Sequence, residues 1–170
     1  YNQFAQEILD KNSDLYKFNP EVVFLHLDTR TLAGENFFNP NDPSFDVSSW
    51  QCDTFQLYQD LIAQLLESEK KVIVSLLESP DINPLGVMEA STNGISRAVN
   101  EINLKLMSLS DEQENIFLFD YDKFLGKLGK KYTFDNKLYY LADIRLKPNF
   151  LGALARGHIK RRVIWIEKIL

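Results

Sequence analysis

The chain has 170 residues, 45% of them hydrophobic and 25% charged, with a formal net charge of −5. This length predicts one domain with its own core, and an acidic balance argues against a nucleic-acid binder, which needs a basic surface. No apolar run approaches the roughly 18 residues of a transmembrane helix, and we expect no membrane contact and no signal peptide. The single cysteine, Cys52, excludes an internal disulfide and a cysteine-based zinc site and favours the cytoplasm.

The first elements in the chain are a helix expected over residues 2–10 and a turn expected over residues 13–18. A short apolar run over residues 22–27 follows them, and two similar runs lie at 72–77 and 116–119. Near-continuous apolar runs that are rich in β-branched and aromatic residues are typical of strands buried on both faces of a parallel sheet. The three runs therefore predict three parallel strands.

Helical patterns occupy the two stretches between these strands. The first helix is expected to begin with a capping box formed by Ser48 and Gln51. Its apolar positions are Phe55, Tyr58, Ile62 and Leu65, and those of the second helix are Ile95, Val99, Ile102, Leu106 and Leu109. Strands that alternate with helices favour right-handed crossovers and a helix-covered sheet. The expected fold class is therefore α/β, with three α/β/α layers and a flavodoxin-like parallel sheet.

The remaining segments are less regular. Residues 29–47 are expected to form a long polar loop, and residues 122–129 a short helix. Residues 131–146 mix aromatic, leucine and charged positions and suggest no firm assignment. Residues 149–162 have a helical pattern, and the stretch 163–166 either continues that helix or begins another strand.

Polar residues follow each predicted strand, and they are the candidates for a binding site. Ligands of open α/β sheets bind beyond the carboxyl ends of the strands, and these ends meet at one edge. The functional interpretation is a polar cleft for a small ligand or for the side chains of a partner. The alternative is that polar residues begin wherever a strand leaves the core. The candidate binding residues are Asp28, Arg30, Glu78, Ser79, Asn83 and Asp120.

No motif in the chain predicts catalysis. Phosphatases of the haloacid-dehalogenase type carry Asp-x-Asp-x-Thr after an apolar strand, but His26 stands where the nucleophilic Asp is required. His26 itself is expected to be a core residue. Two histidines and one cysteine do not predict a metal site, and no glycine-rich phosphate loop is present. We therefore expect no catalytic residue, no metal and no cofactor.

Several segments, in their order and spacing across residues 6–155, resemble FkbH-like proteins. They are Gln6–Asp10, Ser13–Val23, Pro84–Gly86 with Glu89 and Ala90, Glu101–Asn103 and Asp135–Leu141. The resemblance implies an N-terminal domain similar to SGNH hydrolases, which precedes a catalytic domain of the haloacid-dehalogenase superfamily, subfamily IIIC. It also implies an association with loading a glyceryl unit onto an acyl carrier protein, or with surface-carbohydrate and polyketide pathways.

The chain departs from SGNH hydrolases at both of their catalytic motifs. The Gly-Asp-Ser that follows their first strand is absent, and their late Asp-x-x-His would fall on residues 135–138, with Leu138 in place of the histidine. A serine hydroxyl is not activated without a base. The resemblance thus implies an SGNH-like accessory domain over residues 1–155 that lacks its first strands, and a helix or linker toward a following domain over 156–170.

The expected role is non-catalytic: docking or orienting a tethered catalytic domain or a carrier protein. Two alternatives remain open, which are an SGNH-type esterase whose nucleophile motif lies outside this chain and a free-standing α/β interaction module. The strand at 22–27 would form a bare sheet edge, and bare edges recruit another strand. We expect upstream residues, the segment Val163–Ile166 or a second copy of the chain, as a homodimer, to cover it.

Overall fold

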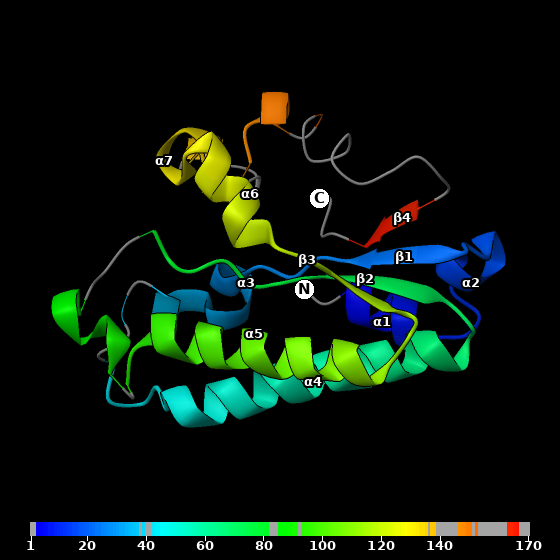
Figure 1. Ribbon diagram of the computed structural model, residues 1–170, viewed down its shortest axis with the longest axis horizontal. Coiled ribbons are helices and arrows are strands. Elements are labelled where there is room, and N and C mark those ends of the chain that lie inside the picture. The colour runs from blue at the N-terminus through cyan, green and yellow to red at the C-terminus, as the bar shows by residue number, and fades with distance from the viewer. Residues whose placement is uncertain are drawn as a thin grey trace.

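The computed structural model describes residues 3–37, 39, 42–81, 85–91, 93–135, 137–138, 146–150, 152 and 163–166. Its centre is a parallel sheet with the strand order β3-β2-β1-β4 (Figure 1). The strands are β1 (Val22–Leu25), β2 (Lys71–Ser75), β3 (Ile116–Phe119) and β4 (Val163–Ile166). All neighbouring strands are parallel, so their carboxyl ends meet at one edge, as predicted.

Helices cover both faces of the sheet, which confirms the predicted α/β class with its three layers. The long helices α4 (Val47–Glu67) and α5 (Ile95–Glu112) lie on one face with α1 (Gln3–Leu9) (Figure 1). The opposite face carries α6 (Tyr121–Leu128) and α7 (Lys130–Thr133). The shorter elements are α2 (Asp14–Phe18), α3 (Thr29–Ala33) and the 3-10 helices η1 (Gly34–Phe37) and η2 (Gly86–Ala90).

The core has two parts because successive strand residues point to opposite faces of the sheet. Val23 and Leu25 of β1 belong to the larger cluster, which the apolar stripes of α4 and α5 complete. Phe24 points to the other face and packs in a smaller cluster with Phe119 and Leu125. The predicted stripes are confirmed: their buried members are Tyr58, Ile62, Leu65, Ile95, Val99, Ile102 and Leu106.

Two predicted irregular segments are in fact partly helical. The predicted turn over residues 13–18 contains α2, and the predicted loop over 29–47 begins with α3 and η1. The physical reason for α3 is the cap that precedes it. The Asp28 carboxylate accepts hydrogen bonds from the backbone N–H of Thr31 at 2.9 Å and from its hydroxyl at 2.8 Å. This side chain satisfies a backbone donor that the first turn leaves free.

The predicted capping box of Ser48 and Gln51 is wrong. The N-cap of α4 is Asp46, whose carboxylate accepts from the backbone N–H of Ser48 at 2.9 Å and of Ser49 at 3.3 Å. These two hydrogen bonds lower the pKa of Asp46 below its usual value, together with one from the Ser49 hydroxyl. A carboxylate at a helix N-terminus also interacts favourably with the helix dipole. The helix therefore begins at Val47.

The two possible caps predict different mutational effects. Replacement of Asp46 by Ala removes the acceptor for two backbone donors, so the melting temperature should fall by a few degrees. Replacement of Ser48 by Ala should leave the melting temperature nearly unchanged. Thermal unfolding followed by circular dichroism measures the melting temperature of both variants. A larger decrease for Ser48→Ala than for Asp46→Ala would show that Ser48 caps the helix after all.

The segment 163–166 is a strand, which decides between the two alternatives for it. β4 pairs with β1 in the register Val22 to Val163 and Leu25 to Ile166, so this segment covers the edge that we expected to be bare. Within 131–146, α7 is followed by an antiparallel bridge from Phe134 to Leu146. Most of the predicted helix over 149–162 lies outside the described residues. No described helix is long and apolar enough to cross a membrane.

Candidate functional site

The carboxyl edge of the sheet brings the ends of β1 and β2 into direct contact. The Thr29 N–H donates to the Glu78 carboxylate at 3.2 Å, and the Thr29 hydroxyl donates to the Glu78 backbone carbonyl at 2.6 Å. Both residues are buried. The expectation that the residues following the strands gather at one edge is thus confirmed for this pair.

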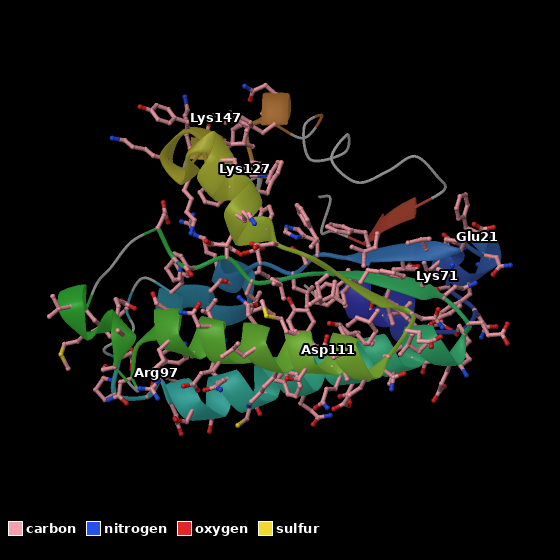
Figure 2. All side chains as sticks on the ribbon, in the orientation of Figure 1. Glu21, Lys71, Arg97, Asp111, Lys127 and Lys147 are labelled. Atoms are coloured by element: carbon pink, nitrogen blue, oxygen red, sulfur yellow. The ribbon has the colours of Figure 1, made fainter. Side chains whose placement is uncertain are left out.

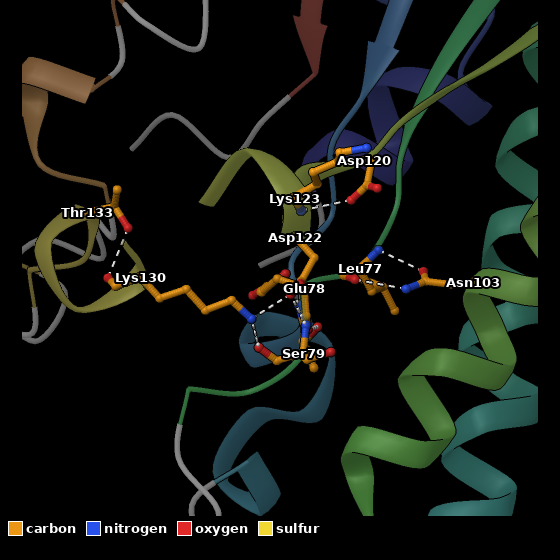
Figure 3. Close-up of polar contacts among 10 residues, drawn as sticks. Leu77, Glu78, Ser79, Asn103, Asp120, Asp122, Lys123, Lys130 and Thr133 are labelled. Carbon is orange, nitrogen blue, oxygen red and sulfur yellow. Dashed lines mark hydrogen bonds and ion pairs between the residues drawn. The ribbon is translucent and has the colours of Figure 1, made fainter. Parts of the chain in front are cut away.

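Beyond β2, residues 76–79 continue at the carboxyl edge and are held mainly by side chains. The Leu76 N–H donates to the Phe119 carbonyl at 2.9 Å. At Leu77, the Asn103 amide of α5 accepts from the backbone N–H and donates to the backbone carbonyl, both at 2.9 Å (Figure 3). The amide of Asn103 thus takes the place of the neighbouring-strand groups that would otherwise bond to the N–H and carbonyl of the buried Leu77.

An ion pair holds the backbone on both sides of Ser79. The Ser79 N–H donates to the Asp122 carboxylate at 2.8 Å, and the Lys130 ammonium donates to the Ser79 carbonyl at 2.8 Å. Lys130 also contacts Asp122 at 2.5 Å, so the three residues form a closed set of polar contacts (Figure 3). Because the side chains come from α6 and α7, they tie these helices to the end of β2.

Burial sets the acidity of the carboxyl group at the centre of this edge. Glu78 is 5% exposed, and burial raises its pKa to about 7. Hydrogen bonds from the backbone amides of Glu78 and Thr29 and the charge of Lys130 oppose this rise. The neighbouring Tyr58 is fully buried, and burial followed by the charge of Glu78 raises its pKa well above the usual value. Glu78 therefore takes up or releases a proton near neutral pH.

The other predicted site residues occupy separate positions at the same edge. Asp28 caps α3, and Asp120 caps α6 by accepting from the Lys123 N–H at 2.8 Å (Figure 3). The half-buried Arg30 places its guanidinium carbon 5.7 Å from the centre of the Phe37 ring, within cation–π range. Asn83 lies outside the described residues.

Sequence reasoning omitted three residues that shape this edge, namely Asn103, Asp122 and Lys130. Asn103 follows the buried Ile102 in α5, so a polar side chain beside an apolar stripe was the available signal. His26 is a core residue, as predicted: it is 6% exposed, and its ring contacts Tyr121 edge-on at 4.5 Å. The described part of the chain contains no group of His, Cys, Asp and Glu residues that could hold a metal ion.

A comparison of the sequence with known domain families gives one match. The sequence matches the model of the FkbH N-terminal domain over residues 1–161. The chain belongs to this family. No curated protein matched the sequence of this FkbH N-terminal domain.

A solved structure supports the fold of the FkbH N-terminal domain. It is the crystal structure of the N-terminal part of a Bacteroides fragilis protein that contains a phosphatase domain, complexed with Mg. The TM-score is 0.73 at 21% sequence identity, and the match covers 91% of our chain and 40% of that one. The chain therefore spans less than half the length of this neighbour. β4 begins at Val163, just beyond the family match, whereas the carboxyl-edge residues lie within it.

Removal of the Lys130 charge should shift the pKa of Glu78 by a measurable amount. Because the charge of Lys130 lowers the pKa of Glu78, replacement of Lys130 by Met should raise that pKa further above about 7. A carbon-13 NMR titration of the Glu78 carboxyl group measures the change. Lys127→Met is the matched control, because Lys127 is exposed on α6 and takes no part in the contacts around Ser79. Equal pKa values in both variants would contradict the electrostatic account.

Proposed function

We propose that this FkbH N-terminal domain is non-catalytic and docks or orients a partner. The partner is a tethered catalytic domain of the haloacid-dehalogenase type or an acyl carrier protein, in glyceryl or acyl transfer or in surface-carbohydrate biosynthesis. Membership of the FkbH family supports the proposal, as does the fold shared with a protein that contains a phosphatase domain. The lone cysteine supports a cytoplasmic location.

The observation that supports the proposal is that polar side chains at the carboxyl edge form hydrogen bonds with the backbone. Asp28 and Asp120 cap helices, and Asn103 holds the backbone of Leu77. Asp122 and Lys130 hold the backbone N–H and carbonyl of Ser79. A catalytic nucleophile needs a general base within hydrogen-bond reach, and the base needs its own orienting group. Groups that already hold the backbone instead build a rigid surface, and a rigid surface loses little conformational entropy on binding.

The proposal predicts that the chain alone hydrolyses neither p-nitrophenyl acetate nor p-nitrophenyl phosphate above background. The reason is that the carboxylates at this edge and the Lys130 ammonium form hydrogen bonds with the backbone; the carboxylates are those of Asp28, Glu78, Asp120 and Asp122. Absorbance at the wavelength of p-nitrophenolate measures both reactions. Reproducible turnover that disappears when a single serine is replaced would contradict a non-catalytic role.

A binding experiment tests the docking role itself. Calorimetric titration of the chain with a phosphatase-type domain of an FkbH-like protein, and separately with a holo acyl carrier protein, should reveal one binding partner. Arg30→Glu should weaken that binding by about tenfold or more, because it reverses a charge at the carboxyl edge. Lys71→Glu is the matched control, since exposed Lys71 begins β2 at the opposite end of the strands (Figure 2). No binding to either partner would contradict the proposal.

A further inference from the structure

The charge of the chain is distributed unevenly along its length. Residues 1–120 carry 7 lysines and arginines against 20 aspartates and glutamates, whereas residues 121–170 carry 12 against 4. The net charge of −5 therefore combines a strongly acidic part with a basic one. Because a docked partner meets the local field of a surface rather than the net charge of the molecule, the position of the basic part in the fold matters for binding.

The fold places lysines of the basic part on the face of the sheet that carries α6 and α7. Lys123 and Lys127 are four residues apart on α6, and both are exposed. They lie on the side of the helix opposite to its buried residues, Tyr121 and Leu125. Figure 2 shows Lys127 on this face of the sheet and Asp111 of α5 on the other.

Three further lysines extend this surface beyond α6. Lys131 and Lys137 are exposed, and Tyr132, between them, is 69% exposed. The backbone N–H of Lys147 donates to the Thr133 carbonyl at 3.0 Å, so Lys147 lies beside the end of α7. We call this surface the basic face, and its residues are Lys123, Lys127, Lys131, Tyr132, Lys137 and Lys147.

The described carboxylates of residues 121–150 are already engaged in local contacts. Asp122 pairs with Lys130 and accepts from the Ser79 N–H. Asp135 accepts from the backbone N–H of Lys137 at 2.9 Å. In the part of the chain that the structure describes, the five lysines of the basic face form no ion pair. The basic face therefore keeps an excess of positive charge.

We infer that the basic face is the docking surface for the carrier protein, which meets it with a surface lined by carboxylates. This inference rests on the proposed docking function and assigns a surface to one of the two partners named there. The basic face borders the carboxyl edge, because α6 follows Asp120 directly and Lys130 ties α7 to the Ser79 carbonyl beyond β2. A carrier protein on the basic face therefore lies next to that edge.

Exposed charge of this kind favours a partner that arrives by diffusion. Complementary charges raise association rates from about 10⁵–10⁶ to as much as about 10⁸–10⁹ M⁻¹ s⁻¹ at low salt. A tethered catalytic domain is already held at an effective concentration on the order of millimolar, so steering adds little to its docking. A carrier protein is a separate molecule that must find the domain, and the lysines serve this encounter. The exposed ring of Tyr132 adds the kind of aromatic contact that is enriched in interfaces.

The borders of the basic face favour a compact acidic protein over a nucleic acid. The exposed Asp120 precedes α6, and the exposed Glu112 and Glu114 precede β3, the strand that leads into α6. A protein surface can contact the lysines without covering these carboxylates. A nucleic acid that extends past the basic face would bring its phosphates toward them, and the net charge of −5 also repels a long polyanion.

The first test measures how the association rate depends on salt. Stopped-flow fluorescence with a labelled holo acyl carrier protein gives this rate at sodium chloride concentrations from about 50 to about 500 mM. The association rate should fall by about tenfold or more over this range, while the dissociation rate changes less. The apo carrier protein should bind about as tightly as the holo form, because carboxylates rather than the phosphate of the prosthetic arm contact the lysines.

The second test uses charge reversal to locate the surface. Lys123→Glu with Lys127→Glu should slow association and weaken binding of the carrier protein by about tenfold or more. Lys11→Glu with Lys71→Glu is the matched control, because both lysines are exposed, lie outside the basic face and change the net charge by the same amount. Tyr132→Ala should instead raise the dissociation rate, since it removes contact area without a change of charge. Circular dichroism verifies that each variant folds.

Four results would overturn the assignment of the carrier protein to the basic face. They are an association rate that does not depend on salt, equal weakening by the two double variants, binding of the holo form alone, and tighter binding of a single-stranded oligonucleotide than of the carrier protein. Binding of the phosphatase-type domain without the carrier protein would also overturn the assignment, but the docking function would stand. The docking function itself fails only if neither partner binds, so the two failures are distinguishable.

Discussion

The free energy of unfolding should fall by about 3 kcal/mol as the pH rises from about 4.5 to about 7, as a result of one residue, Glu78. Burial raises the pKa of Glu78 from 4.5 to about 7 in the folded state. Between these two values the unfolded chain releases the proton while the folded chain retains it. The contribution of Glu78 to the free energy of unfolding is therefore fully present below pH 4.5. It declines between pH 4.5 and about pH 7 and is lost above pH 7.

Replacement of Glu78 by Gln should abolish this part of the pH dependence. The glutamine carbonyl can still accept from the Thr29 N–H, but the side chain stays neutral at every pH. We therefore expect the variant to be more stable than the wild type above pH 7, by up to about 3 kcal/mol. Urea unfolding at half-unit steps from pH 4 to pH 8 measures the difference between the two proteins.

The matched control for Glu78 is Glu67→Gln. Glu67 lies in α4 with its side chain 65% exposed, so its neutralisation should leave the pH profile of stability nearly unchanged. If Glu78→Gln and the wild type lose stability in parallel between pH 4.5 and 7, Glu78 does not hold its proton in the folded state.

Loss of the Asn103 amide should destabilise the fold by about 2–4 kcal/mol. Leu77 is fully buried, and both of its backbone hydrogen bonds go to Asn103. Replacement of Asn103 by Ala leaves a buried N–H and a buried carbonyl without their partners, and each such group costs about 1–3 kcal/mol. Urea unfolding measures the loss, and hydrogen exchange of the Leu77 amide shows whether it is local.

Asn100→Ala is the matched control for Asn103. Asn100 is exposed on the same helix, and alanine has the higher helix propensity, so this variant should be as stable as the wild type or slightly more stable. Equal free energies of unfolding for the two alanine variants would mean that the hydrogen bonds from Asn103 to Leu77 do not stabilise the fold.

The strands and the long helices could be predicted because burial on both faces leaves a clear sequence pattern. Residues 22–25, 72–74 and 116–119 are apolar at every position, and the stripe from Ile95 to Leu106 has a helical period. The short helices after Ser13 and Asp28 were missed because a helix of five residues is too short to leave a periodic pattern in the sequence. Pairing of β4 with β1 depends on a long-range contact that no local pattern specifies.

The candidate site was predictable in position but not in its contacts. Parallel strands place their carboxyl ends together, so the neighbourhood of Glu78 and Ser79 followed from the strand assignments. Asn103 stands beside an apolar stripe, but its contact could not be predicted, because its partner Leu77 is 26 residues away. The buried state of Glu78 was equally hidden, since a glutamate that follows a strand is normally exposed.

The most direct test of the docking role is an NMR titration of the nitrogen-15-labelled chain with a phosphatase-type domain of an FkbH-like protein. The account predicts that amide shift changes concentrate at the carboxyl edge, at Asp28, Arg30, Ser79 and Asp120, and that the amino ends of the strands near Glu21 and Lys71 stay unchanged. Shift changes confined to the amino ends of the strands, or no changes at all with this domain and with a holo acyl carrier protein, would contradict it.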